Sequence, residues 1–149
     1  MRKQMLAVTV LGCVCMGVAF AADQVMAPAP QETQAQIPAE AKGFAGMIAG
    51  KVISKGENQL VVEVAKIERT WKHSQAANAE SLVGKQVTIR IVPQTYAKKE
   101  GYLTRVQKFF ALLKAGDSTS FDVKYAEGDS LTFLELTKAQ AEQVEKAGQ

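Results

Sequence analysis

The sequence predicts a small, mainly β domain in which five strands form a barrel that is closed by one helix. Three observations predict this class. Short segments in which apolar and polar residues alternate recur along the chain, as expected for half-buried strands. Residues 102–113 instead repeat their apolar side chains with helical spacing. Turn-forming residues separate the segments, so the predicted order is strand, strand, strand, helix, strand, strand.

The first predicted strand covers residues 44–54 and contains two glycines, Gly46 and Gly50. Glycine inside a strand indicates a bulge or the close approach of another backbone segment. We therefore expect this strand to bend sharply enough to contribute to both sides of a small barrel. A turn at residues 55–58 connects it to the second strand, residues 59–67, so the two strands form a hairpin.

Residues 68–84 show no clear period and are predicted to form a long loop. Loops of this length in compact domains are often functional or mobile. The third strand follows at residues 87–92 and ends at Pro93, because proline cannot donate a hydrogen bond to a neighbouring strand.

The predicted helix begins near Tyr102 and is expected to end at Gly116, which suits the left-handed residue that follows many helices. A capping-box pattern at residues 104–107 gives an alternative start. The apolar face that should close the barrel consists of Tyr102, Val106, Phe109, Phe110 and Leu113.

The last two strands are predicted at residues 120–125 and 131–136, joined by a turn at residues 127–129. A second capping-box pattern, Thr137 to Gln140, predicts a short C-terminal helix within residues 138–149. Its only clear apolar residue late in the segment is Val144, so we expect a helix that frays on the surface.

This order of elements resembles the OB-fold, a five-stranded Greek-key barrel with a helix between strands three and four. The resemblance covers about residues 43–137 and includes the helix-to-strand junction Lys114-Ala115-Gly116-Asp117. It implies a closed barrel whose helix plugs one end. Another small β-barrel or an α+β meander is the alternative. The resemblance implies no particular activity, because the OB-fold serves many unrelated functions.

The N-terminus is predicted to be a secretory signal peptide, residues 1–22. It has a basic start at Arg2 and Lys3, an uncharged run through Phe20, and small residues before a cleavage point near Ala22. The predicted location is therefore the periplasm of a Gram-negative bacterium. An uncleaved anchor and a lipoprotein modified at Cys13 are the alternatives. Residues 23–42 are rich in Ala, Gln and Pro and predict a flexible leader.

Processing would change both the cysteine content and the charge of the chain. Cys13 and Cys15 lie inside the signal, so the mature chain would have no disulfide, thiol nucleophile or thiolate metal site. Loss of Arg2 and Lys3 lowers the formal net charge of +3 by two, to +1. A nearly neutral protein has no general affinity for polyanions.

The residues predict neither catalysis nor a cofactor. The chain has a single histidine, His73, and no recognisable nucleophile motif. The acidic residues of the mature chain lack the spacing of a calcium loop, so no metal site is predicted. We expect Asp117 and residues 127–129 to be turn residues.

A non-enzymatic binding or accessory module of the cell envelope is therefore the predicted function, with an envelope protein, peptide or saccharide as its partner. The alternative is a single-stranded nucleic-acid binder, because cations lie among aromatic residues that could stack on bases. The low net charge and predicted export disfavour nucleic acid. The candidate binding residues are Arg69, Trp71, Lys72, His73, Arg90, Tyr96, Lys98 and Lys99.

Overall fold

A computed structural model describes residues 35–149, in which five strands form the predicted closed barrel. Neighbouring strands follow the order β1-β2-β3-β5-β4, and β4 pairs with β1 to close it. All pairs are antiparallel except β3 with β5. The strands are β1 (Ala45–Gly56), β2 (Gln59–Thr70), β3 (Gln86–Arg90), β4 (Ser118–Ala126) and β5 (Ser130–Phe133). The predicted signal peptide, the Cys13 alternative and most of the predicted leader lie outside the described residues.

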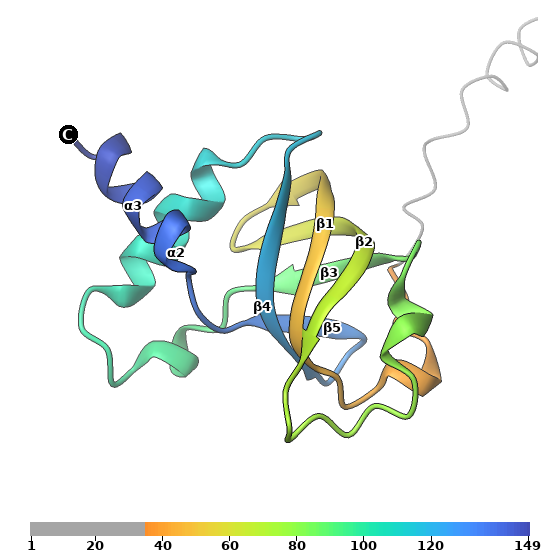
Figure 1. The fold of residues 1–149 in the computed structure, drawn as a ribbon. Helices are drawn as coiled ribbons and strands as arrows, with labels where there is room; N and C mark the ends of the chain where they lie inside the picture. Colours follow the sequence, from red (N-terminus) through yellow and green to blue (C-terminus); the bar gives the residue numbers. More distant parts are fainter. Residues whose placement is uncertain (1–34) are drawn as a thin grey trace, which may run out of the picture. The chain divides into compact units, whose positions relative to one another are not determined.

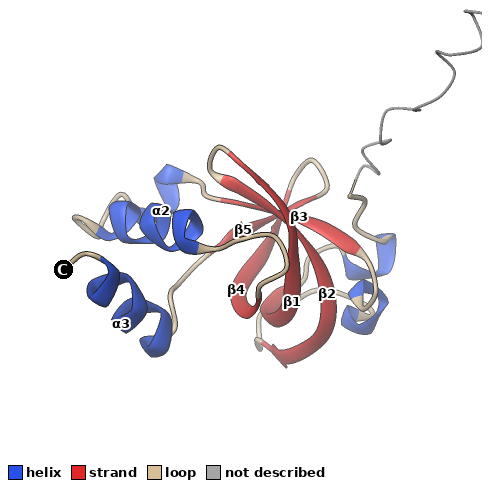
Figure 2. Cartoon of the chain, turned by 90° about the horizontal axis from the view of Figure 1, so that it is seen from above, coloured by secondary structure: helices blue, strands red, loops and turns tan. Residues whose placement is uncertain are grey.

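Two α-helices accompany the barrel, α2 (Tyr102–Leu112) and α3 (Lys138–Ala147). Helix α2 lies between β3 and β4 in the chain, as the resemblance to the OB-fold implies. Two views show α2 and α3 side by side on one side of the barrel (Figures 1 and 2). Residues 35–149 also form three short 3₁₀ helices: η2 (Ala39–Ala41), η3 (Ala79–Leu82) and η4 (Pro93–Tyr96). Within residues 35–149, no helix is long and apolar enough to cross a membrane.

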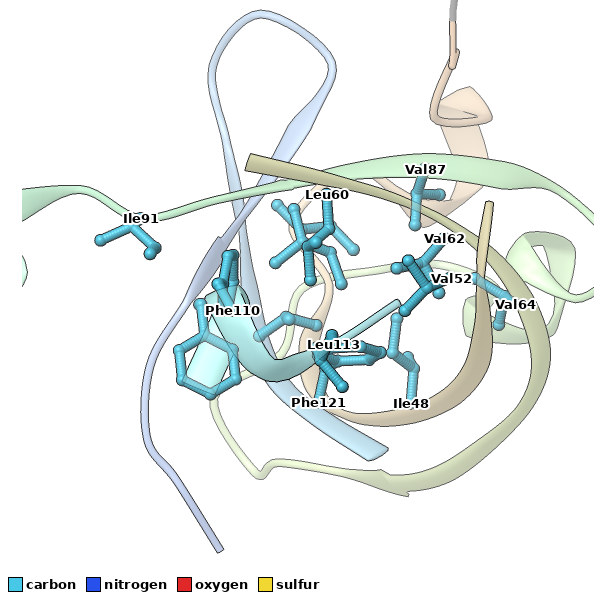
Figure 3. Packing of buried hydrophobic residues seen from close by; sticks show 14 of the residues in the cluster. Ile48, Val52, Leu60, Val62, Val64, Val87, Ile91, Phe110, Leu113 and Phe121 are labelled. Carbon is cyan, nitrogen blue, oxygen red and sulfur yellow. The ribbon is translucent and has the colours of Figure 1, made fainter. Parts of the chain in front are cut away.

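The core fills the barrel and continues under α2. Alternate residues of the strands point inward, so their apolar side chains meet in the interior (Figure 3). The ring centroid of Phe133 lies 6.2 Å from the ring centroid of Phe109, 5.4 Å from that of Phe110 and 6.4 Å from that of Phe121. The predicted apolar face of the helix therefore closes the barrel through these aromatic contacts.

The two glycines of β1 allow β1 and β2 to come close together, as predicted. An added Cβ at Gly46 would lie 2.1 Å from the carbonyl oxygen of Arg69, and one at Gly50 would lie 2.5 Å from Cγ1 of Val62. The β1–β2 register shifts just after Met47 and again just before Gly50. At both shifts the extra residue, Glu68 or Ala65, lies in β2. A bulge of this kind bends the strand that carries it and increases the local twist.

Strand β2 is longer than predicted, because its pairing with β1 continues from Ile67 to Thr70. Arg69 is therefore a strand residue and not part of the loop. The two additional pairs, Gly46 with Thr70 and Met47 with Arg69, lie at the close approach that Gly46 permits. The polar residues at this end of β2 show no apolar alternation from which the extension could be predicted.

Helix α2 begins at Tyr102, as predicted, but its C-terminal end differs from the prediction. The helix stops at Leu112, before the left-handed Gly116 (φ 99°), which instead lies in a turn and donates its N–H to the carbonyl of Val52 at 2.7 Å. Lys55, near the end of β1, donates through Nζ to the carbonyl oxygens of Ala111 and Leu113, each at 2.9 Å. Thr104 lies inside the helix, so the pattern at residues 104–107 is not its cap.

The folded domain includes residues that the sequence assigned to the leader. Ile37 is 4% exposed and Ala41 is fully buried. The carbonyl of Glu40 accepts a hydrogen bond of 2.9 Å from the N–H of Asn78. The structure therefore places the start of the domain before the predicted boundary at residue 43.

Helix α3 begins with the predicted capping box, in which the side chains of Thr137 and Gln140 each bond to the other's backbone N–H. Its packing differs from the prediction of a frayed surface helix. Val144 is only 5% exposed, and Nε2 of Gln140 donates to the carbonyl of Ser120 at 2.6 Å. These contacts attach α3 to α2 and β4.

Candidate functional site

A pocket of about 310 Å³ lies beside Trp71. Four segments that are far apart in the chain form it: the residues after β2, the stretch from η4 towards α2, strand β4, and the residues after β5. Its lining residues are Trp71, His73, Thr95, Tyr96, Lys99, Asp122, Leu134 and Glu135. The pocket thus combines aromatic and apolar surface with several hydrogen-bonding groups.

Trp71 is held in place on several sides. Its backbone N–H donates to the carbonyl of Ala45 at 2.8 Å, which continues the β1–β2 contacts one residue past β2. Its indole Nε1 donates to Oδ1 of Asp122, also at 2.8 Å. The guanidinium carbon of Arg69 lies 5.4 Å from the centroid of the indole ring. Trp71 is therefore an ordered part of the pocket wall.

Asp122 is a half-buried carboxylate on the outward side of β4, between the buried residues Phe121 and Val123. Burial raises the pKa of Asp122, and the nearby Glu135 carboxylate acts in the same direction. The hydrogen bond from Trp71 and the charge of His73 partly counter this rise in the pKa. None of the ion pairs formed within residues 35–149 includes Asp122.

Tyr96 and Lys99 connect the stretch from η4 towards α2 to the end of β5 and the chain after it. Tyr96 is 3% exposed and its hydroxyl donates to the carbonyl of Phe133, so its ring is mainly a core group that borders the pocket. Burial raises the pKa of this phenol. Lys99 pairs with Glu135, which raises the pKa of Lys99, and its Nζ lies 5.0 Å from the ring centroid of Tyr102.

The structure brings together half of the predicted binding residues. Trp71, His73, Tyr96 and Lys99 line one pocket. Arg69 contacts Trp71 but is not part of the lining. Lys72, Lys98 and Arg90 are exposed and do not line it; Arg90 lies on β3, where it pairs with Gln59 and Thr132.

Sequence reasoning missed the two carboxylates of the pocket, Asp122 and Glu135, and its smaller lining residues, Thr95 and Leu134. Alternation along β4 indicated that Asp122 faces outward. It did not indicate that Asp122 meets Trp71, which lies 51 positions earlier in the chain. That contact depends on the pairing of β4 with β1, which brings the two segments together.

The chemistry available in the pocket suits non-covalent binding. Indole and phenol rings provide apolar surface, while His73, Lys99, Glu135 and Asp122 provide donors and acceptors. In the part of the chain that the structure describes, no group of three or more His, Cys, Asp or Glu side chains is placed to hold a metal ion.

A second pocket, of about 270 Å³, lies between the β1–β2 turn and α2. Its lining includes Lys55, Asn58 and Gln107. Lys55 is already bonded to the end of α2, and Nε2 of Gln107 donates to Oδ1 of Asn58 at 3.1 Å. Because these polar groups bond to one another or to the helix, this pocket offers fewer free groups to a ligand than the pocket beside Trp71.

Comparison with protein-family models, with curated proteins and with solved structures finds no match for this chain. The functional interpretation therefore depends on the geometry of the pocket itself.

Proposed function

We propose that this protein is an exported, non-enzymatic binding or accessory module of the bacterial cell envelope that holds a protein, peptide or saccharide in the pocket beside Trp71. One observation carries the proposal: the fold gathers four of the predicted binding residues, from separate segments, around a single cavity. The proposal of export rests on the signal-like pattern of residues 1–22.

The arrangement of the pocket supports binding. Trp71, Tyr96 and Leu134 supply apolar surface, and Lys99 and Glu135 supply charged groups at the same cavity. Small-molecule and side-chain sites commonly combine apolar walls with a few placed polar groups. Trp71 and Tyr96 are already fixed by hydrogen bonds, so binding would cost little side-chain entropy at these two residues.

The hydrogen bonding of Asp122 supports a role in binding over a role in hydrolysis. A histidine that acts as a general base is normally oriented by a carboxylate. Among residues 35–149 no ion pair joins His73 to a carboxylate, Asp122 instead accepts from the indole of Trp71, and His73 is exposed. We therefore assign Asp122 to the support of the binding surface.

The alternative of nucleic-acid binding finds less support. Arg90 lies beside Gln59 and Thr132 on the neighbouring strands, so its strand partners offer no aromatic ring on which a base could stack. Trp71 is the lining residue with a large aromatic surface next to cations. Binding of nucleic acid would be detected by titration with an oligodeoxythymidine.

The single tryptophan of the chain makes the pocket directly observable, because its fluorescence reports any ligand that contacts Trp71. The mature protein would be titrated with blocked tripeptides of mixed sequence, with a glucosamine trisaccharide and with an oligodeoxythymidine. We expect a saturable change in emission with a peptide or with the saccharide.

Two lysine variants serve as a matched pair in this titration. Lys99→Met removes a charge from the pocket and should change the Kd of the ligand, whereas Lys108→Met removes a charge from an exposed position of α2 outside the pocket and should not. A salt-sensitive response to the oligodeoxythymidine alone would favour the nucleic-acid alternative. No saturable response to any of the three probes would contradict the proposal.

A further inference from the structure

We infer that the pocket beside Trp71 receives the guanidinium group of an arginine side chain presented by a partner peptide or protein. This inference rests on the proposed binding function and names the chemical group that the pocket recognises.

The charge balance of the pocket favours a cation. Two carboxylates, Asp122 and Glu135, line it with one ammonium, Lys99, and Lys99 is already paired with Glu135. Asp122 is left without a cationic partner among the described residues. Its Oδ1 accepts from Trp71, while its Oδ2 accepts none of the hydrogen bonds found within residues 35–149. A carboxylate can accept further hydrogen bonds through that second oxygen.

Asp122 is half-buried, so the absence of a cationic partner among residues 35–149 has an energetic cost. A carboxylate that is removed from water without a paired cation is unfavourable, because it loses hydration without a compensating charge. The raised pKa of Asp122 is the sign of that cost. A ligand cation at Oδ2 would offset it with a charge-assisted hydrogen bond. Carboxylates with such perturbed pKa values in a cavity are often functional groups.

The aromatic walls favour guanidinium over ammonium. A guanidinium is planar and weakly hydrated, so it can stack on an aromatic ring and donate to a carboxylate at the same time. Trp71 already contacts a guanidinium of this chain, that of Arg69, whose Cζ lies 5.4 Å from the ring centroid. Arg69 does not line the pocket, so the lining does not include its charge. The ring of Tyr96 is 3% exposed and only borders the cavity, so Trp71 is the ring available for stacking.

The size of the pocket and the placement of Lys99 are compatible with such a ligand. A cavity of about 310 Å³ is small for a binding site and suits a single side chain. Besides the exposed His73, Lys99 is the lining cation that would oppose a guanidinium. Its ammonium is held by Glu135 and lies 5.0 Å from the ring centroid of Tyr102, so its charge is already balanced.

A pair of isosteric peptides tests the inference with the unaltered mature chain. The protein would be titrated with acetyl-Gly-Arg-Gly-amide and with the same peptide containing citrulline, while the emission of Trp71 is recorded. Citrulline keeps the planar shape but has no charge. We expect saturable binding of the arginine peptide and a Kd at least about tenfold higher for the citrulline peptide, because hydrogen bonds to a carboxylate are stronger when the donor is charged.

Variants then assign the effect to Asp122. Asp122→Asn keeps an oxygen that can accept from Nε1 of Trp71 but removes the charge, so it should reduce the preference for arginine over citrulline to near one. Glu127→Gln removes a carboxylate from the exposed turn between β4 and β5 and should leave the preference unchanged. The comparison of the two peptides on the wild type does not depend on whether either variant folds.

Each possible outcome either supports or overturns the inference. Equal affinity for the two peptides, or a response to the trisaccharide without a response to arginine, would overturn the inference and leave the proposed binding function intact. A preference for arginine that persists in Asp122→Asn would also overturn it. No saturable response to the peptides, the trisaccharide or the oligodeoxythymidine would contradict the proposed function as well.

Discussion

The hydrogen bond between Trp71 and Asp122 joins a residue that the sequence indicated with one that it did not. Trp71 was a candidate because it lies among cations in a polar segment. Asp122 was expected only to face outward from a strand. Aromatic and basic residue types can be recognised in a sequence, but a carboxylate becomes part of a site only through its neighbours in space. Glu135 was missed for the same reason, since its partner Lys99 lies 36 positions earlier in the chain.

Asp122 should make stability depend on pH in a definite direction. Its pKa in the folded state is raised above the ordinary value, mainly by burial. Stability from this group is therefore fully present below the unfolded pKa and is lost as pH rises through the folded pKa. We expect the free energy of unfolding of the wild type to fall relative to that of Asp122→Asn between about pH 3 and pH 7.

Urea denaturation of both proteins across this pH range measures that difference. The other titratable groups facing Asp122 are Glu135, His73 and Lys99, and they are present in both proteins. Glu127→Gln is the matched control and should show no such trend relative to the wild type. A constant difference between wild type and Asp122→Asn at all pH values would show that burial of Asp122 has no such effect.

At the scale of single elements, strand β1 determines where Trp71 is placed. Gly46 pairs with Thr70, the residue before Trp71, and the carbonyl of its neighbour Ala45 accepts from the backbone of Trp71. The close approach at the glycines was predictable, because glycine inside a strand usually marks a bulge or a close backbone approach. The extension of β2 to Thr70 was not predictable, because it results from pairing with β1 and not from the pattern of its own residues.

Gly46→Ala should therefore destabilise the barrel and disturb the pocket together. An added Cβ would lie 2.1 Å from the backbone oxygen of Arg69, so the strands must separate locally. Overpacking of this kind costs about 1–3 kcal/mol in unfolding free energy. We also expect the emission of Trp71 to shift to longer wavelength, as its surroundings become more exposed to water.

Gly56→Ala is the control for this strand. Its added Cβ would lie 3.2 Å from the side chain of Gln59, which can move away, so we expect a much smaller loss of stability and no shift in emission. If both substitutions lowered stability equally, the close approach at Gly46 would not be the cause.

For helix α2, the sequence correctly predicted a left-handed glycine but wrongly predicted that this glycine ends the helix. Gly116 does adopt the left-handed conformation, but in a turn after the helix has ended. The helix ends earlier, at Leu112, where Lys55 of β1 bonds to the carbonyl groups of Ala111 and Leu113. That interaction joins residues 56 and 58 positions apart, so no pattern within residues 102–116 could reveal it.

At the scale of the whole molecule, the order of elements was enough to predict the barrel. Five alternating segments and one amphipathic helix leave few ways to bury every apolar face, and the closed arrangement is one of them. The boundary of the domain was harder to predict. Ile37 lies in a segment rich in Pro, Ala and Gln, whose composition is typical of a leader, yet its side chain is part of the core.

Ile37→Ala tests whether this early segment stabilises the barrel. Truncation of a buried isoleucine typically costs about 2–5 kcal/mol in unfolding free energy. Val83→Ala, at a residue that is 39% exposed, is the control and should change stability by about 0.5 kcal/mol or less. Chemical denaturation of the two variants measures the difference. An equal, small effect at both positions would show that residue 37 lies outside the cooperative unit.

The pocket draws its lining from four separate segments, and this has a thermodynamic consequence. Its residues come together only when β2, β4, β5 and the chain around η4 are all in place, so the unfolded chain cannot bind the same ligand in the same way. Any occupant must then raise the melting temperature of the barrel, by a free energy of about 2.7 kcal/mol when its free concentration is about 100 times its Kd. A rise in the melting temperature therefore reports that the pocket is occupied, even when the chemical nature of the ligand is not known beforehand.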